Sequence, residues 1–133
     1  MKYALRLIMI GLILSIFGCE KVSDDAVELS VDFTWEGMKP CGWGNPEIHV
    51  SGVPEKTKML KISMYDHAYK HDHGKVLVPY TGNEIFEMNK FKGLQGPCPP
   101  GSPGRYKITI KALDEKEVVI GIGSKERNFP EKL

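Results

Sequence analysis

Apolar and polar residues alternate along most of the chain after residue 26. The alternation is clearest in residues 27–35, 60–64 and 106–112, where every second residue is apolar. Successive side chains of a strand point to opposite faces, so this period of two predicts strands with one buried face. Shorter apolar runs predict weaker strands at residues 48–50, 76–78 and 118–122.

Turn-forming residues separate these segments. Glycine and proline are concentrated in residues 40–46, 52–54 and 93–104. Only residues 83–92 suggest helical periodicity, and there we expect a single turn of helix. Short strands, frequent turns and almost no helix predict an all-β fold, either an antiparallel sandwich or a barrel.

The first 18 residues have the pattern of a signal peptide. Lys2 and Arg6 give a positive start, and residues 7–17 form an apolar run that is too short to cross a bilayer comfortably. A permanent N-terminal anchor helix is the alternative. The run ends in Ile16-Phe17-Gly18-Cys19, which resembles the bacterial lipobox.

That resemblance implies cleavage after Gly18 and lipidation of Cys19, with a diacylglycerol on its sulfur and a further acyl chain, such as palmitate, on its amine. Two or more acyl chains anchor a protein stably. We therefore expect a lipoprotein of the bacterial cell envelope, with residues 19–26 as a polar lipidated tether and residues 27–133 as the β-domain. Glu20, in place of aspartate, favours the outer membrane, facing the periplasm, if the cell has two membranes.

Charge and size exclude some functions. The chain has 133 residues, enough for one domain, with 18 Lys and Arg against 17 Asp and Glu. This balance gives no electrostatic reason to expect a nucleic-acid partner.

Two cysteines remain once Cys19 carries lipid. Export places Cys41 and Cys98 where disulfides persist, so we predict that they pair. The chain-entropy model gives such a bond about 3–4 kcal/mol. Two free buried thiols are the alternative. We expect Trp35 and Trp43 in or near the core, with Trp43 covering the disulfide.

Several motifs, in order, resemble the phosphatidylethanolamine-binding protein family in its bacterial Raf-kinase-inhibitor-like branch. Residues 45–48 (NPEI) and 51–55 (SGVPE) match its "SPE(I/L)…SGVPEGT" stretch, residues 96–100 (GPCPP) with 105–106 (RY) match "GPCPPxGxHRY", and residues 112–114 match its "ALD". The resemblance implies an all-β fold, an antiparallel two-sheet sandwich with Greek-key connections, and a pocket for a phosphate-like or carboxylate anion.

Carried onto this sequence, the resemblance implies a pocket of seven residues: Asp66, His73, Gly96, Pro97, Pro99, Pro100 and Tyr106. Two departures are clear. Gly104 replaces the histidine of "HRY", and Asp66-His67-Ala68-Tyr69 lacks the second aspartate and the proline of the family's "DPDxP". The pocket can therefore be functional or eroded.

The chemistry of these residue types supports anion binding independently. Backbone N–H groups of a glycine-rich loop can converge on an anion. An imidazole supplies charge or a neutral donor, and a carboxylate fixes its tautomer. Arg105 is expected to form a structural ion pair at the pocket floor.

Residues 66–73 also raise the question of metal binding. His67, His71 and His73 with nearby aspartates could suit zinc or copper, but no distant further ligand is evident, so an exposed polar loop is preferred. No catalytic motif is present, and we expect neither an enzyme nor a cofactor.

The sequence thus predicts a lipid-anchored envelope protein that binds a small anion. One alternative is a surface module that binds or inhibits an envelope protein and has an eroded pocket, and another is a metal-binding histidine loop.

Overall fold

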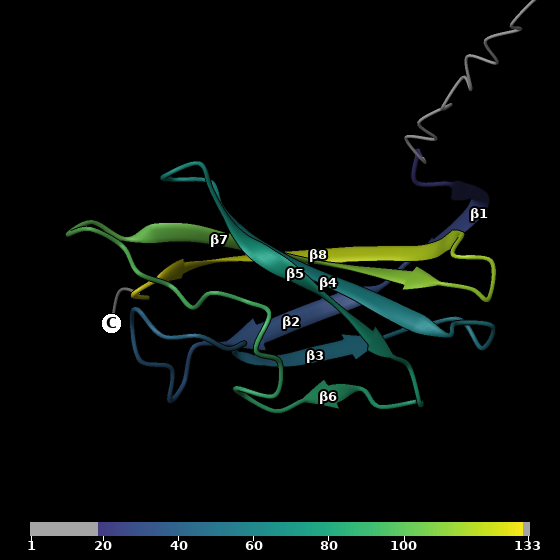
Figure 1. The fold of residues 1–133 in the computed structure, drawn as a ribbon, viewed down its shortest axis with the longest axis horizontal. Coiled ribbons are helices and arrows are strands. Elements are labelled where there is room, and N and C mark those ends of the chain that lie inside the picture. The colour runs from purple at the N-terminus through teal and green to yellow at the C-terminus, as the bar shows by residue number, and fades with distance from the viewer. Residues whose placement is uncertain (1–18, 132–133) are drawn as a thin grey trace, which may run out of the picture.

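A computed structural model describes residues 19–131 of the chain, which form eight strands (Figure 1). The predicted signal peptide lies outside the described residues. Within residues 19–131, no helix is present that could cross a membrane. The strands are β1 (Val22–Glu28), β2 (Ser30–Thr34), β3 (Glu47–Ser51), β4 (Met59–Asp66), β5 (His71–Pro79), β6 (Ile85–Phe86), β7 (Gly104–Leu113) and β8 (Val119–Phe129).

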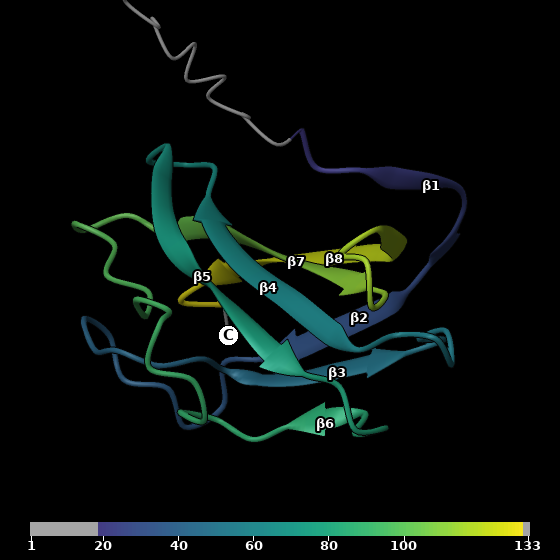
Figure 2. The ribbon, with the colours of Figure 1, turned by 45° about the vertical axis from the view of Figure 1, so that its right-hand side comes forward.

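The strands form two facing sheets, with the order β1-β8-β7-β4-β5 in the larger and β2-β3-β6 in the smaller (Figures 1 and 2). After β5 the chain enters the smaller sheet at β6 and returns to the larger one at β7, beside β4. This is the Greek-key type of connection. The all-β sandwich prediction is confirmed, with one refinement: β1 and β8 pair in parallel, so the larger sheet is mixed.

The core lies between the two sheets and explains the period of two in the sequence. Leu60, Ile62 and Met64 of β4 are fully buried, and Ile108 and Ile110 of β7 continue the same inner surface. Phe33 and Ile48 cover it from the smaller sheet. Burying such apolar side chains is the main stabilising term of a small domain.

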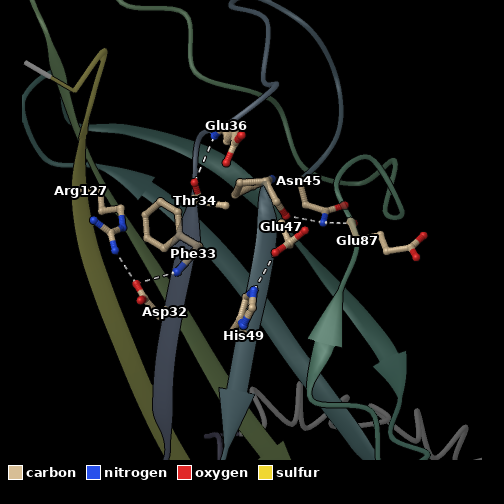
Figure 3. A network of polar contacts seen from close by, with 10 residues as sticks. Asp32, Phe33, Thr34, Glu36, Asn45, Glu47, His49, Glu87 and Arg127 are labelled. Atoms are coloured by element: carbon tan, nitrogen blue, oxygen red, sulfur yellow. Dashed lines mark hydrogen bonds and ion pairs between the residues drawn. The ribbon is translucent and has the colours of Figure 1, made fainter. Parts of the chain in front are cut away.

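The weaker predicted strands are real, but the predicted helical turn is wrong. Residues 48–50 lie in β3, residues 76–78 in β5, and the run from 118 extends as β8 to Phe129. In residues 83–92 the chain forms the short strand β6 and turns. Backbone groups there bond to the buried Asn45: its side-chain amide donates to the carbonyl of Glu87 at 2.9 Å (Figure 3), and its oxygen accepts from the N–H of Phe91 at 2.8 Å. These bonds replace those of a helix.

The predicted tether is also shorter than expected. Residues 22–26, placed in the tether by their polar composition, belong to the edge strand β1 (Val22–Glu28), which pairs with β8. The N–H of Val119 donates to the carbonyl of Lys21 at 2.8 Å. An edge strand held mainly by backbone bonds needs few apolar side chains, so its composition resembles that of a linker. The ordered domain therefore begins near Glu20 rather than at residue 27.

A charged contact joins the two sheets at one edge. The guanidinium of Arg127 on β8 lies 2.7 Å from the carboxylate of Asp32 on β2 (Figure 3). This hydrogen bond is the main reason that the pKa of Asp32 is lowered. On the neighbouring strand, His49 and Glu47 form a solvent-exposed pair at 2.7 Å. Exposed pairs of this kind contribute little stability.

The disulfide between Cys41 and Cys98 is present, as predicted. It joins the loop after β2 to the loop before β7. The two loops also bond through their backbones: the N–H of Gly96 donates to the carbonyl of Gly42, and the N–H of Cys41 to that of Pro97. Trp35 is buried as expected, but Trp43 is 70% exposed, so its placement in the core was wrong.

Candidate functional site

The predicted pocket residues meet where three neighbouring strands of the larger sheet come together at one end. Asp66 is the last residue of β4, and its register partners are His71 on β5 and Tyr106 on β7. His73 follows on β5 with its side chain directed inward and only 4% exposed. The hairpin of β4 and β5 forms this end of the sandwich, at the upper left of Figure 1. Sequence positions 40 residues apart thus supply one site.

A cavity of about 340 Å³ lies between this strand end and the loop before β7. Four of the seven predicted residues line it: Asp66, His73, Pro100 and Tyr106. Gly96, Pro97 and Pro99 are not among its lining residues. Four further lining residues were not predicted: Tyr69, His71, Gln95 and Cys98. His71 could have been found, because it shares the i, i+2 spacing with His73, whereas the other three depend on how the loops fold back.

Asp66 has a structural role as well as a place in the cavity. It is 2% exposed, and its Oδ1 accepts hydrogen bonds from the N–H groups of Ala68, Tyr69 and Arg105, at 2.8, 3.3 and 3.1 Å. These bonds fix the β4–β5 turn and the start of β7. Buried carboxylates need such donors, because an unpaired buried charge is costly. Asp66 therefore shapes the site and adds a negative charge beside it.

His73 is a neutral side chain at neutral pH. Its Nδ1 lies 2.9 Å from the carbonyl oxygen of Gln95, which can only accept, so Nδ1 carries the proton. In the neutral ring Nε2 is then an acceptor. Burial lowers the pKa of His73, and the neighbouring His71, whose ring centre lies 4.8 Å away, lowers it further. The site thus presents an acceptor where sequence analysis expected a positive charge or a donor.

Tyr106 supplies a hydroxyl group without a partner. Its side chain is fully buried, and the hydroxyl forms no hydrogen bond of normal geometry with the described residues, although the Asp66 carboxylate and the backbone of Cys98 lie near it. Burial raises the pKa of Tyr106 to about 12, and the charge of Asp66 acts in the same direction. The hydroxyl therefore keeps its proton. A buried donor left without an acceptor costs about 1–3 kcal/mol, so a ligand that accepts this proton would gain that energy.

A steric contact explains why Gly104 stands where the family has a histidine. A Cβ at Gly104 would lie 2.4 to 2.7 Å from the ring and hydroxyl of Tyr106. No side chain fits there while Tyr106 keeps its position. The ring of Tyr106 also packs edge-on against Trp35, at 5.4 Å between centres, and against His73, at 5.1 Å. The missing histidine therefore marks a rearranged site in which the tyrosine ring takes up the space.

The glycine- and proline-rich loop does not form the expected cradle of N–H groups. The N–H of Gln95 donates to His73, that of Gly96 to Gly42 and that of Gly101 to Pro99, all to carbonyl oxygens. Prolines have no N–H to offer. The expectation that loop N–H groups converge on an anion is therefore wrong for these positions. The loop instead closes one side of the cavity through Gln95, Cys98 and Pro100.

No lysine or arginine lines this cavity. Arg105, expected at its floor, is 56% exposed and pairs with Glu126 at 3.2 Å. The histidines do not assemble a metal site either. His67 packs against Tyr65 at 4.9 Å between ring centres, while His73 points into the cavity. In residues 19–131 no group of three or more histidine, cysteine or acidic side chains is placed to hold a metal ion.

Comparison with known proteins supports the fold. The chain has the fold of the phosphatidylethanolamine-binding proteins. It superposes on a phosphatidylethanolamine-binding protein homologue from Chlamydia trachomatis with a TM-score of 0.56 at 15% identity, covering 81% of this chain and 99% of that one. YbcL from Escherichia coli, described as a new member of the mammalian family, gives 0.52 at 19% identity, covering 85% and 92%. No family model and no curated protein matches the sequence.

Proposed function

We propose that this protein binds a small oxyanion that carries a proton, such as dihydrogen phosphate or a singly protonated phosphomonoester, in the cavity of Asp66, His73 and Tyr106. The observation that carries the proposal is the buried Tyr106 hydroxyl, which faces this cavity with its proton and no acceptor. An oxygen atom of the ligand would supply that acceptor. The fold, shared with phosphatidylethanolamine-binding proteins, agrees with binding of a small ligand.

The protonated form of the ligand follows from the charges of the cavity. Two negative charges 4 Å apart repel by about 4 kcal/mol at an effective dielectric constant of 20. A fully ionised ligand would be repelled by Asp66 in this way, because no lysine or arginine lines the cavity to offset the repulsion. An O–H of the ligand can instead donate to Asp66 or to Nε2 of His73. Repulsion is thereby exchanged for a hydrogen bond to a charged acceptor, which is among the stronger kinds.

This chemistry makes binding depend on pH. Phosphomonoesters take up their second proton near pH 6. Protonation of His73 would add a positive charge in the same pH range, because the bound anion favours the charged imidazole. Both effects strengthen binding as the pH falls from about 7.5 to about 5.5. The affinity for phosphate should therefore rise in mildly acidic solution.

The test is calorimetric titration of the protein with inorganic phosphate at both pH values, using the wild type and Tyr106→Phe. The variant removes only the unpartnered hydroxyl, so we expect unchanged or slightly higher stability together with weaker binding, by about 10-fold or more. Tyr65→Phe is the matched control, because Tyr65 is exposed and lies outside the cavity. Equal phosphate binding by the wild type and Tyr106→Phe would reject the proposal.

We further propose that Cys19 carries the lipid anchor. Cys19 is exposed and forms no disulfide, so its thiol is accessible. Mass spectrometry of the N-terminal peptide, after expression of the whole chain in a bacterium, should find residues 1–18 removed and acyl chains on Cys19. An unmodified Cys19 in the processed protein would reject this part and leave the cavity unaffected.

A further inference from the structure

The outer surface of the larger sheet carries a group of basic side chains, which we call the basic face. It comprises Lys61, Lys75, Arg105, Lys107 and Lys111. The register places them on one side of the sheet: Lys61 lies opposite Lys111, Lys75 opposite Ser63, and Lys107 opposite Tyr65. The inner side of the same strands is the apolar core, so these side chains point to solvent.

The chain just after Cys19 is fixed on this face. The carboxylate of Glu20 lies 2.7 Å from Nζ of Lys61 and also pairs with Nζ of Lys111. These two lysines are direct cross-strand neighbours and would otherwise repel each other. Glu20 compensates both charges, and its two lysine partners lower the pKa of its carboxyl group. We call this arrangement the Glu20 clasp.

The clasp leaves little slack between Cys19 and the sheet. Consecutive Cα atoms lie about 3.8 Å apart, so Cys19 is one residue from an ion pair on the basic face. Beyond Glu20 the chain continues at once into β1, which pairs with β8. A lipid on Cys19 would therefore bring the outer side of the larger sheet close to the bilayer.

The chemistry of the basic face suits an anionic membrane surface. Five basic side chains share this face with four acidic ones, Glu20, Glu28, Asp72 and Glu126, and Glu20 belongs to the clasp. Leu77, opposite Lys61, is 50% exposed, and Tyr65 is 38% exposed. Exposed aliphatic and tyrosine side chains among lysines are typical of surfaces that contact lipid headgroups.

We propose that the basic face lies against the membrane, oriented by the Glu20 clasp beside the lipid-bearing Cys19. The orientation at the membrane rests on the proposed lipidation of Cys19. The role of the basic face can be tested with an artificial lipid in place of the biological anchor. The cavity lies at the far end of β4, where Asp66 is five residues from Lys61 of the clasp and so about 17 Å away along the strand. In this orientation the cavity opens beside the membrane surface at a distance from the lipid.

The test uses Cys19, which is the free cysteine of the described chain. A chain starting at Cys19 keeps all eight strands and the disulfide. Coupling it through Cys19 to a maleimide lipid in anionic phospholipid vesicles replaces the biological anchor. The reaction of each lysine with an amine-acylating reagent is then measured by mass spectrometry. The reference is the same protein with Cys19 blocked by a soluble maleimide.

We expect Lys75 and Lys107 to react about fivefold more slowly on the vesicles, which corresponds to about 1 kcal/mol for a lysine near an anionic surface. Lys39, after β2, and Lys90, after β6, are exposed controls beside the smaller sheet and should be unaffected. Equal protection of all four lysines, or stronger protection of Lys39 and Lys90, would overturn the proposal.

Discussion

The two ends of the larger sheet use charge in opposite ways. At one end Asp66 is buried, its Oδ1 accepts three backbone N–H groups, and the nearby His73 is neutral. At the other, Glu20 is about one third exposed and pairs with two lysines that are also about one third exposed. The buried end has few charges and precise geometry, and the exposed end has many charges and loose geometry.

This difference separates the proposed recognition site from the proposed contact surface. Buried polar groups are costly when they are unsatisfied, so the Tyr106 hydroxyl and Asp66 can discriminate between ligands by the hydrogen bonds that each completes. Exposed ion pairs are screened by water and salt and contribute little individually. The Glu20 clasp can therefore orient the chain while barely changing the stability of the fold.

Loss of the disulfide should have the largest effect on the comparison, because the cross-link lies at the cavity end and joins two loops there. Replacing Cys41 and Cys98 by serine removes a cross-link between residues 57 apart in sequence, worth about 4 kcal/mol in the chain-entropy model. We expect a loss of this size in urea unfolding followed by the fluorescence of the buried Trp35. Hydrogen exchange should show the loop around residues 95–100 opening while β1 stays paired. Equal loss of protection in β1 would contradict the separation of the two ends.

Gly104→Ala should damage the cavity with a smaller cost in stability. The added methyl group would overlap the ring of Tyr106, and overpacking of this kind costs about 1–3 kcal/mol. We expect reduced stability and weak phosphate binding together. Gly42→Ala is a suitable control, since a Cβ there meets only one atom, at 4.0 Å. A Gly104→Ala protein that binds phosphate normally would show that the position of Tyr106 is unimportant.

Acid should lower the free energy of unfolding through His73, which lies at the cavity end. Its pKa is lower in the folded chain than the usual 6.5, so between these two values the unfolded chain binds the extra proton. The free energy of unfolding should therefore fall as the pH decreases below about 6.5, and His73→Gln should flatten this dependence. Chemical denaturation at a series of pH values measures the slope. Added phosphate should offset part of the loss in the wild type, and a steeper slope in His73→Gln would refute this assignment.

Glu20→Gln should have the smallest effect on stability. The variant keeps the size of the side chain and removes the charge that the two lysines share, at a cost of about 0.5 kcal/mol. We expect faster amide exchange in residues 20–22 at low salt and no change in phosphate affinity. A loss of phosphate affinity would show that the two ends are coupled.

The sequence predicted the fold through the spacing of its apolar residues and the site through a few motif positions. Asp66, His73 and Tyr106 could be named in advance because each matches a motif position of the family that the sequence resembles. The disulfide followed from the number of cysteines and the predicted export. The strand β1 could not be predicted, because it is held by backbone bonds that leave no apolar signature.

Loop geometry accounts for the other errors. Whether an N–H in the segment before β7 faces an anion or another carbonyl depends on how it folds against residues 41–44, and no local pattern encodes this. Trp43 was expected in the core from its type alone, yet its loop holds it outward. The need for glycine at position 104 could not be predicted either. It arises because the ring of Tyr106 lies against the backbone of Gly104, two residues earlier in the chain.

Proton uptake on ligand binding tests the central claim most directly. Titration of the wild-type protein with inorganic phosphate at about pH 7.5, in two buffers of different ionisation enthalpy, gives the number of protons taken up per phosphate bound. A cavity that combines Asp66, a neutral His73 and the protonated Tyr106 should take up a proton with the anion, and the uptake should diminish near pH 5.5, where protonated phosphate already dominates. Binding with no proton uptake, or with proton release, would contradict the proposed chemistry.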